Sequence, residues 1–280
     1  LVLVTLFIPA GLAQAERARG YILATASTGG TYYPVGVALA TLTKIKLAPT
    51  QYISVSAINS AGSGENIKLL AENQAQLAIL QGLYGAWAWQ GTGPFQTLGQ
   101  QPYLRSITML WQNVEQFVVK KEYATTGFIT DLANLTGEKF SIGKRNSGTE
   151  GSGLHILSAL SIAPEKLVMA NLGYSGSANA LQNNMIAGMN IPAGIPTNAL
   201  TRAFSSQGDN IKLLNFSEAD IKQANNGMNL WSRFVIPENT YPGQSKAVTT
   251  MAQPNFLAVR ADVSEQDVYQ ITKIIYENLP

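Results

Sequence analysis

Three short segments carry residue types that could hold an anion. Each combines glycine with hydroxyl, amide or acidic side chains and precedes an expected helix: Thr28-Gly29-Gly30-Thr31-Tyr32-Tyr33, Ser60-Ala61-Gly62-Ser63-Gly64-Glu65-Asn66 and Asn146-Ser147-Gly148-Thr149-Glu150. The first backbone N–H groups of a helix have no intrahelical partner, and the helix dipole adds partial positive charge there. Such turns suit a carboxylate or phosphate. One turn alone is better explained as an ordinary helix cap, but three together favour a ligand.

Further side chains could extend this candidate site. Tyr32 and Tyr33 could stack on a ligand or hydrogen-bond to it, and Gln81, at the end of an expected strand, could donate to a carboxylate. Arg145 could pair with an anion, and Tyr174 opens another glycine-rich turn. Each is explained equally well without a ligand, as a half-buried pair, a strand terminus or a solvated turn residue.

Catalytic and metal-binding patterns are missing from the sequence. It has no cysteine, and its single histidine, His155, falls inside an expected helix. There is no G-x-S-x-G elbow, H-x-x-E-H motif or EF-hand loop. Residues 137–145 are a near miss for a P-loop, one residue too long and with Arg145 where Ser or Thr would hold magnesium. We therefore expect no catalytic residue, metal or cofactor.

The composition indicates an ordered protein without a nucleic-acid surface. Apolar residues make up 46% of the 280 residues, which is enough for a large core and argues against disorder. The 19 basic and 17 acidic residues are spread along the chain and form no basic block, so we expect no nucleic-acid partner. The lack of cysteine suits an oxidising compartment, although many cytosolic proteins share it.

Residues 1–15 read as a secretory signal peptide. An apolar run, LVLVTLFIPAGLA, is followed by Ala13-Gln14-Ala15, with small residues where signal peptidase needs them. The positively charged n-region is missing, and a core strand or helix is the alternative interpretation. We expect export to the periplasm, and a truncated C-terminus, because the chain stops at Pro280 directly after an expected helix.

The elements that must position the turns alternate between strand and helix. We expect strands over residues 21–26, 53–57, 76–81, 139–143, 167–172, 185–191 and 256–260. We expect helices over residues 32–47, 65–73, 150–160, 177–184 and 264–279, the last with a capping box from Ser264 to Asp267. A β-rich stretch over 105–121, interrupted at Gln112-Asn113, separates two such series. This repetition predicts two α/β lobes with mostly parallel sheets, in which ligands bind at the carboxyl ends of the strands.

Together these segments resemble the TAXI branch of substrate-binding receptors for tripartite ATP-independent periplasmic (TRAP) transporters. The resemblance covers nearly all of residues 21–280 and is carried by the three turns, by Ala75 to Gln81, by Tyr174 to Leu181 and by Gly194-Ile195-Pro196. The sequence departs from the family at Ala187, where an aspartate is common. It departs also at Lys144-Arg145, which is more basic than the usual small residues.

The resemblance implies an α/β, two-lobed type II periplasmic-binding-protein fold with a ligand cleft between the lobes. Lobe I would comprise residues 16–113 and 250–280, and lobe II residues 114–249, with outward crossing over 105–121 and return over 247–259. The residues expected to bind ligand are Thr28, Gly29, Gly30, Thr31, Tyr32, Tyr33, Ser60, Gly62, Ser63, Glu65, Asn66, Gln81, Arg145, Ser147, Gly148, Thr149, Tyr174 and Pro196.

The implied function is that of a non-catalytic, monomeric receptor. It would capture a small organic anion, such as an acidic amino acid or a dicarboxylate, by lobe closure and deliver it to the integral membrane components of a TRAP transporter. Two alternatives stay open. One is an enzyme on the same fold, with carboxylates such as Glu65 and Glu150 in its cleft; the other is the receptor of an ATP-driven (ABC) importer.

Overall fold

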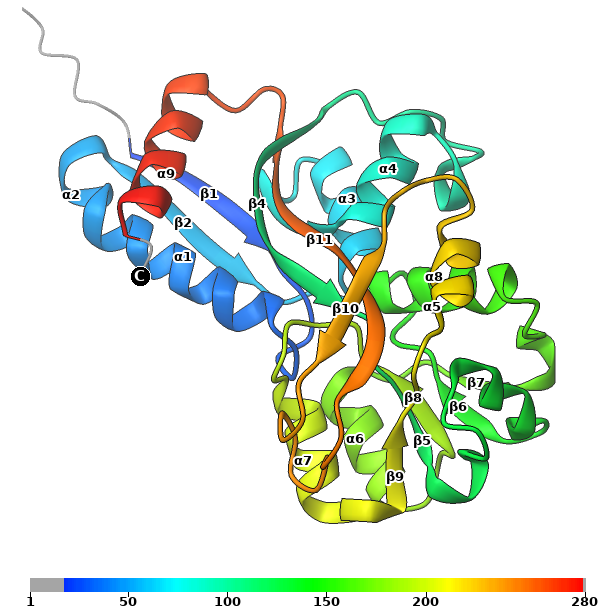
Figure 1. Cartoon of the computed structure of the whole chain (residues 1–280). Coiled ribbons are helices and arrows are strands. Elements are labelled where there is room, and N and C mark those ends of the chain that lie inside the picture. Colours follow the sequence, from blue (N-terminus) through cyan, green and yellow to red (C-terminus); the bar gives the residue numbers. More distant parts are fainter. Residues whose placement is uncertain (1–17, 279–280) are drawn as a thin grey trace, which may run out of the picture.

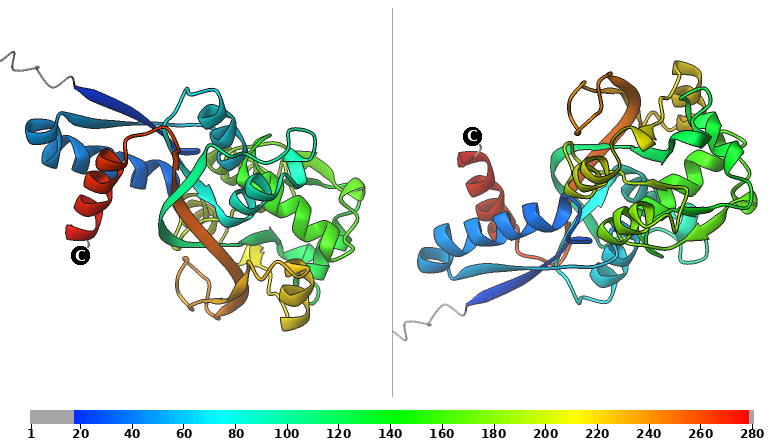
Figure 2. Two further views of the ribbon diagram at one scale, coloured as in Figure 1. Left: turned by 90° about the horizontal axis from the view of Figure 1, so that it is seen from above. Right: turned by 90° about the horizontal axis from the view of Figure 1, so that it is seen from below.

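Residues 18–278, the part that the computed structural model describes, form two sheets with helices packed against them (Figure 1). The expected signal segment, residues 1–15, lies outside the described residues. Seen from above and below, the blue N-terminal helix and strands and the green middle of the chain lie side by side, with the orange strand β11 between them (Figure 2). Among the described residues, no helix is long and apolar enough to cross a membrane.

The first sheet has the strand order β10-β11-β3-β1-β2, with β4 also paired to β11. β1 runs parallel to β2 and β3, whereas β11 is antiparallel to β3, β4 and β10. The strands are β1 (Arg19–Ala24), β2 (Ile53–Ile58), β3 (Leu77–Gln81), β4 (Leu104–Val114), β10 (Ser232–Ile236) and β11 (Val248–Arg260). Its helices are α1 (Tyr32–Lys46), α2 (Ala48–Gln51), α3 (Ser63–Ala71), α4 (Gly82–Gln90), η1 (Gly93–Phe95) and α9 (Glu265–Glu277).

The second sheet has the order β7-β6-β8-β5-β9. β6 is parallel to β7 and β8, and β5 is antiparallel to β8 and β9. The strands are β5 (Phe117–Lys120), β6 (Lys139–Ser141), β7 (Val168–Ala170), β8 (Gly188–Asn190) and β9 (Ile211–Leu213). The helices are η2 (Lys121–Tyr123), η3 (Ile129–Leu135), α5 (Gly148–Ala159), η4 (Pro164–Lys166), α6 (Tyr174–Gln182), α7 (Asn198–Gln207), η5 (Gly208–Asn210) and α8 (Glu218–Asn225).

Strand β3 shows why the first sheet carries helices on both faces. Leu77 and Ile79 pack into one core cluster with residues of α1 and α9, while Ala78 and Leu80 pack into another with residues of α3 and α4. Successive side chains of a strand point to opposite faces, so a central strand buried on both sides reads as one continuous apolar run. This run is LAIL in the sequence, and the polar Gln81 ends it.

Two long strands, β4 and β11, connect the sheets. The expected interruption at Gln112-Asn113 is wrong, because both residues pair with β11, opposite Pro254 and Gln253. The chain instead leaves β4 after Val114 and enters β5 of the second sheet at Phe117. Pairing to β11 stabilises extended backbone at these two polar residues, of which Asn113 is buried and Gln112 exposed, although their strand propensity is low.

Three helices begin earlier than expected. α3 starts at Ser63 rather than Glu65, α5 at Gly148 rather than Glu150, and α6 at Tyr174 rather than Ser177. The small-residue turns therefore supply the first turns of the helices themselves. Since glycine and serine have modest helix propensity, the pattern alone placed them outside the helices.

The capping box expected at the start of α9 is only half formed. The Ser264 side chain accepts a hydrogen bond from the Asp267 backbone N–H. The Asp267 carboxylate, however, accepts hydrogen bonds from Arg19 Nε at 2.7 Å and from the Tyr21 hydroxyl at 2.5 Å. The Asp267 carboxylate thus bonds to side chains more than 240 residues away in sequence, instead of the Ser264 backbone N–H that would complete the capping box.

Candidate functional site

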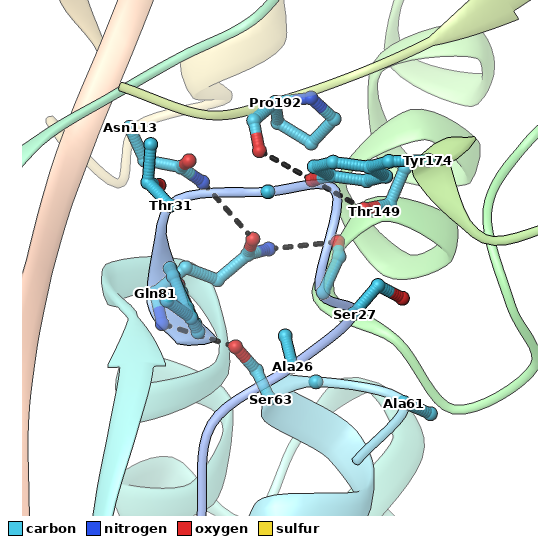
Figure 3. A pocket seen from close by; sticks show the side chains of 14 residues that line it. Ala26, Ser27, Thr31, Ala61, Ser63, Gln81, Asn113, Thr149, Tyr174 and Pro192 are labelled. Atoms are coloured by element: carbon cyan, nitrogen blue, oxygen red, sulfur yellow. Dashed lines mark hydrogen bonds between the residues drawn. The ribbon is translucent and has the colours of Figure 1, made fainter. Parts of the chain in front are cut away.

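One small cavity lies where the two lobes meet. It has a volume of about 30 Å³, room for one or two water molecules. Figure 3 shows that its side chains come from both lobes. The lining residues are Ala26, Ser27, Gly30, Thr31, Tyr32, Ala61, Gly62, Ser63, Gln81, Asn113, Gly148, Thr149, Tyr174 and Pro192. We call this space the inner cavity.

Four helices begin at the inner cavity. α1 and α3 start there at Tyr32 and Ser63, and α5 and α6 start there at Gly148 and Tyr174. Two belong to the first lobe and two to the second. The free amides and the positive dipole ends of four helices thus converge on one space, which favours a negatively charged occupant.

Gln81 joins the lobes at the edge of this cavity (Figure 3). Its Nε2 donates to the Gly148 carbonyl at 2.9 Å, and its Oε1 accepts from Asn113 Nδ2 at 3.3 Å. Its backbone N–H donates to Ser63 Oγ at 3.1 Å. A side chain at the carboxyl end of β3 therefore contacts the crossing strand β4 and the first turn of α5 simultaneously.

The lobes touch directly around the cavity. A Cβ atom on Gly148 would lie 2.5 Å from Gln81 Oε1 and 3.0 Å from Ser63 Oγ, so no larger residue fits there unless its neighbours move. The Tyr84 hydroxyl donates to the Ser147 carbonyl at 3.2 Å across the same boundary. Glycine at position 148 thus permits the close approach of the two lobes.

The two tyrosines that line the cavity, Tyr32 and Tyr174, are neutral. Burial raises the pKa of Tyr32 and of Tyr174 well above its ordinary value, so both hydroxyls stay protonated. The Tyr174 hydroxyl donates to the Pro192 carbonyl at 2.5 Å and lies 3.0 Å from Thr149 Oγ1. No Lys, Arg, Asp or Glu is among the described residues that line the cavity. The described residues also contain no cluster of three or more His, Asp or Glu side chains suited to a metal ion.

Half of the expected ligand-binding residues line the inner cavity. They come from all three turns, from the end of β3 and from the start of α6: Gly30, Thr31, Tyr32, Gly62, Ser63, Gln81, Gly148, Thr149 and Tyr174. The sequence therefore located the parts of the chain that meet. The contacts of these residues with a ligand stay a prediction.

Four of the other expected residues build the turns from within. Ser60 Oγ lies 2.6 Å from Asn66 Oδ1, and Asn66 Nδ2 donates to the backbone carbonyls of Thr25 and Ile79. The Glu65 carboxylate accepts from the Ala61 N–H at 2.6 Å, within its own turn. Ser147 caps α5 through a hydrogen bond from the Glu150 N–H. These side chains therefore hold the turns in shape and do not line the cavity.

The remaining five do not line the inner cavity either. Thr28, Arg145 and Pro196 are exposed, and Tyr33 is half-buried on α1. Gly29 is buried, and its carbonyl accepts a long hydrogen bond of 3.4 Å from Thr197 Oγ1 of the second lobe. Arg145 therefore does not face the inner cavity, and its expected pairing with a bound anion stays a prediction.

Sequence reasoning missed five lining residues: Ala26, Ser27, Ala61, Asn113 and Pro192. Asn113 is the most informative, since it is 1% exposed and its Oδ1 has no hydrogen-bond partner. The polar pair Gln112-Asn113 near the end of a long β-rich stretch was the available signal, and we interpreted it as a break in the strand. Ala26 and Pro192 offered no signal, because their side chains carry no polar atom.

Residues 23–280 match the model of the NMT1-like family. The chain belongs to this family. Several solved structures of other proteins have an architecture similar to that of this NMT1-like chain. The likeness to the effector-binding domain of QuiR in complex with shikimate has a TM-score of 0.55 at 13% identity and covers 93% of this chain and 97% of that one.

Two further proteins, one periplasmic and one bound to a ligand, have folds similar to that of this chain. PhnD1 from Prochlorococcus marinus in complex with methylphosphonate has a TM-score of 0.54 at 14% identity, with 92% of this chain and 84% of that one covered. The periplasmic aliphatic sulphonate binding protein SsuA from Escherichia coli has a TM-score of 0.53 at 12% identity, with 92% and 70% covered. At such identities the likeness establishes the fold alone. The predicted two-lobed α/β fold of the periplasmic binding proteins is thereby confirmed.

Proposed function

We propose that this protein is a periplasmic solute-binding receptor that captures a small organic anion between its lobes. The convergence of four helix N-termini from both lobes on one cavity carries this proposal. An anion there would exchange water for fixed backbone donors and for hydroxyls such as those of Ser63 and Thr149. Because both lobes supply donors, such an anion would be held completely only when the lobes are closed.

Closure would make the bound state recognisable to a membrane partner. A ligand that binds the closed form better shifts the population toward it, and a transporter that docks on the closed form then selects loaded receptor. We propose the integral membrane components of a TRAP transporter as this partner, on the basis of the TAXI-like motifs. An ABC importer is the alternative, and reconstituted transport with each kind of membrane component would separate the two.

An enzyme on the same fold is disfavoured by where the carboxylates point. Glu65 accepts from Ala61 N–H, and Glu150 accepts from Asn146 N–H at 2.8 Å and from Asn171 Nδ2 at 3.1 Å. Both carboxylates therefore stabilise turns. His155 stacks on the Trp231 ring with a centroid distance of 5.3 Å, outside the residues that line the cavity.

A thermal-shift panel tests the proposed function. We expect at least one small anion among acetate, succinate, L-glutamate and methylphosphonate to raise the melting temperature, because a ligand at about 100 times its Kd stabilises the native state by about 2.7 kcal/mol. The NMR spectrum of that anion should be unchanged after prolonged incubation with the protein, whereas an enzyme would convert it.

Two glycine variants provide the controls for that panel. Gly148→Ala should lose most of the shift, since its Cβ would meet Gln81 when the lobes close. Gly176→Ala, on α6, should keep the shift, because its Cβ would meet only Leu172 Cβ at 3.8 Å. A panel without any shift would contradict the proposal.

A further inference from the structure

A second and larger hollow opens beside the inner cavity. Its volume is about 420 Å³, and its walls are mainly apolar. The apolar side chains belong to Val35 on α1, Trp111 and Val114 on β4, Ile195 and Pro196 before α7, and Phe234 on β10. We call this space the outer hollow. None of its described lining residues carries a charge.

The same chain segments wall both spaces. Thr31 lines both spaces. On β4, Asn113 lines the inner cavity, while its neighbours Gln112 and Val114 line the outer hollow. Pro192 lines the inner cavity, and Gly194, two residues later, lines the outer hollow. A long hydrogen bond, from Gly194 N–H to Thr31 Oγ1 at 3.4 Å, joins the lobes at this boundary. At such a length a hydrogen bond is weak, so little energy opposes its replacement by a ligand.

Residue 194 keeps this boundary thin because it is glycine. A Cβ there would lie 3.1 Å from the Trp111 ring and 3.2 Å from Thr31 Cγ2, which is tighter than ordinary contact. A larger side chain would therefore press against Trp111 and Thr31 and block passage between the inner cavity and the outer hollow.

Two buried polar atoms without partners flank this boundary. Asn113 Oδ1 lines the inner cavity on a side chain that is 1% exposed, and Trp111 Nε1 is buried next to Gly194. An unpaired buried donor or acceptor costs free energy until a partner arrives. An oxyanion head at this boundary could accept from Trp111 Nε1, whereas Asn113 Oδ1 is itself an acceptor and needs a donor such as a water molecule.

We infer that the ligand is a monoanion with a short apolar tail. Its oxyanion head binds at the helix starts of the inner cavity, and its tail enters the outer hollow by displacing the Gly194 N–H from Thr31 Oγ1. This inference rests on the proposed function and narrows its ligand class. A dicarboxylate fits poorly, because the inner cavity is small and neither space offers a cationic side chain among its described lining residues.

The experiment compares acetate, butanoate, hexanoate and succinate by isothermal titration calorimetry. Butanoate and succinate have the same number of carbon atoms and differ by the second carboxylate. We expect affinity to rise about fourfold for each methylene that enters the outer hollow, which is the gain from burying one methylene. We expect succinate to bind at least tenfold more weakly than butanoate, since a second charge would lose its hydration without gaining a partner.

Variants locate the tail. Gly194→Val should abolish the gain in affinity from acetate to hexanoate, because its side chain blocks the way into the outer hollow. Phe234→Ala, on the edge strand β10, should reduce the affinity for hexanoate several-fold. Val235→Ala, the next residue of the same strand and absent from the outer hollow's lining, is the matched control and should have no effect.

Succinate binding as tightly as butanoate, or a chain-length gain that survives both Gly194→Val and Phe234→Ala, would overturn this inference and leave the proposed function standing. If none of the four anions binds at millimolar concentration, the inference falls, and the proposed function falls with it only if the thermal-shift panel also shows no shift.

Discussion

At the scale of single residues, Glu115 is a buried carboxylate that accepts hydrogen bonds from neutral side chains. It lies between β4 and β5, where the chain crosses from one sheet to the other, and it is 1% exposed. Its carboxylate accepts from Gln253 Nε2 at 3.2 Å, from Trp231 Nε1 at 3.3 Å and from Ser152 Oγ at 3.4 Å. Burial raises the pKa of Glu115 to about 7, although these hydrogen bonds lower it in part.

This raised pKa makes stability depend on pH. The ordinary pKa of the group is 4.5, so the folded state holds the proton more tightly than the unfolded state. The stabilisation is complete below pH 4.5 and is lost as the pH rises through about 7. We expect Glu115→Gln, which stays neutral, to remove this loss and to exceed the original protein in unfolding free energy at pH 8 by roughly 2–3 kcal/mol.

Urea unfolding at pH 5 and pH 8 measures the effect of Glu115. Glu122→Gln, at an exposed carboxylate in η2, should leave the difference between the two pH values unchanged. Equal pH dependence in the original protein and in Glu115→Gln would contradict this prediction, because it would mean that ionisation of Glu115 does not destabilise the folded state.

At the scale of elements, one carboxylate ties the last helix to the first strand. Asp267 lies in the first turn of α9, is 2% exposed, and accepts hydrogen bonds from Arg19 and Tyr21 of β1. The burial of this carboxylate makes the tie stronger than an exposed ion pair, since screening by water is reduced. α9 packs on the face of the sheet that also carries α1, so its position depends on this contact.

We expect Asp267→Asn to lower the free energy of unfolding by about 1–3 kcal/mol, because the buried partners lose a charged acceptor. Urea denaturation measures the change. Asp262→Asn is the control: Asp262 pairs with Arg260 at 2.9 Å but its side chain is 59% exposed, so its loss should cost much less than the loss of the Asp267 carboxylate. Equal losses in both variants would contradict the role of burial.

At the scale of the whole molecule, the two lobes come within covalent reach of each other. A Cβ on Gly29 of the first lobe would lie 2.5 Å from Ser175 Oγ of the second. The chain has no cysteine, so an introduced pair has no competing thiol. A disulfide here would report the closed arrangement directly, because its geometry tolerates only short separations.

We expect the double variant Gly29→Cys/Ser175→Cys to form this disulfide under mild oxidation, and faster with a bound anion. Once oxidised, the double variant should show no change in melting temperature when an anion is added, since the disulfide keeps the lobes together and the anion cannot enter between them. Reduction of the disulfide should restore the change. Non-reducing electrophoresis and mass spectrometry follow the bond. The two single-cysteine variants are the controls, and failure to oxidise with ligand present would contradict closure at this point.

The sequence by itself determined the order of the elements and the chemistry of the turns. Alternating strand and helix patterns, with small polar residues between them, predicted two α/β lobes and brought forward Gly30, Gly62 and Gly148, which all line the inner cavity. This succeeds because strand burial and helix capping depend on residues a few positions apart. The signal segment and the lobe boundaries stay predictions from the sequence.

Only the tertiary structure decided which side chains face the inner cavity. Glu65 and Glu150 bond within their own turns, Arg145 is exposed, and Asn113 lies in a paired strand rather than at a break. Gln81 meets Gly148 across 67 residues of sequence. Such contacts depend on how closely two separately folded lobes approach, and no local pattern in the chain records that distance.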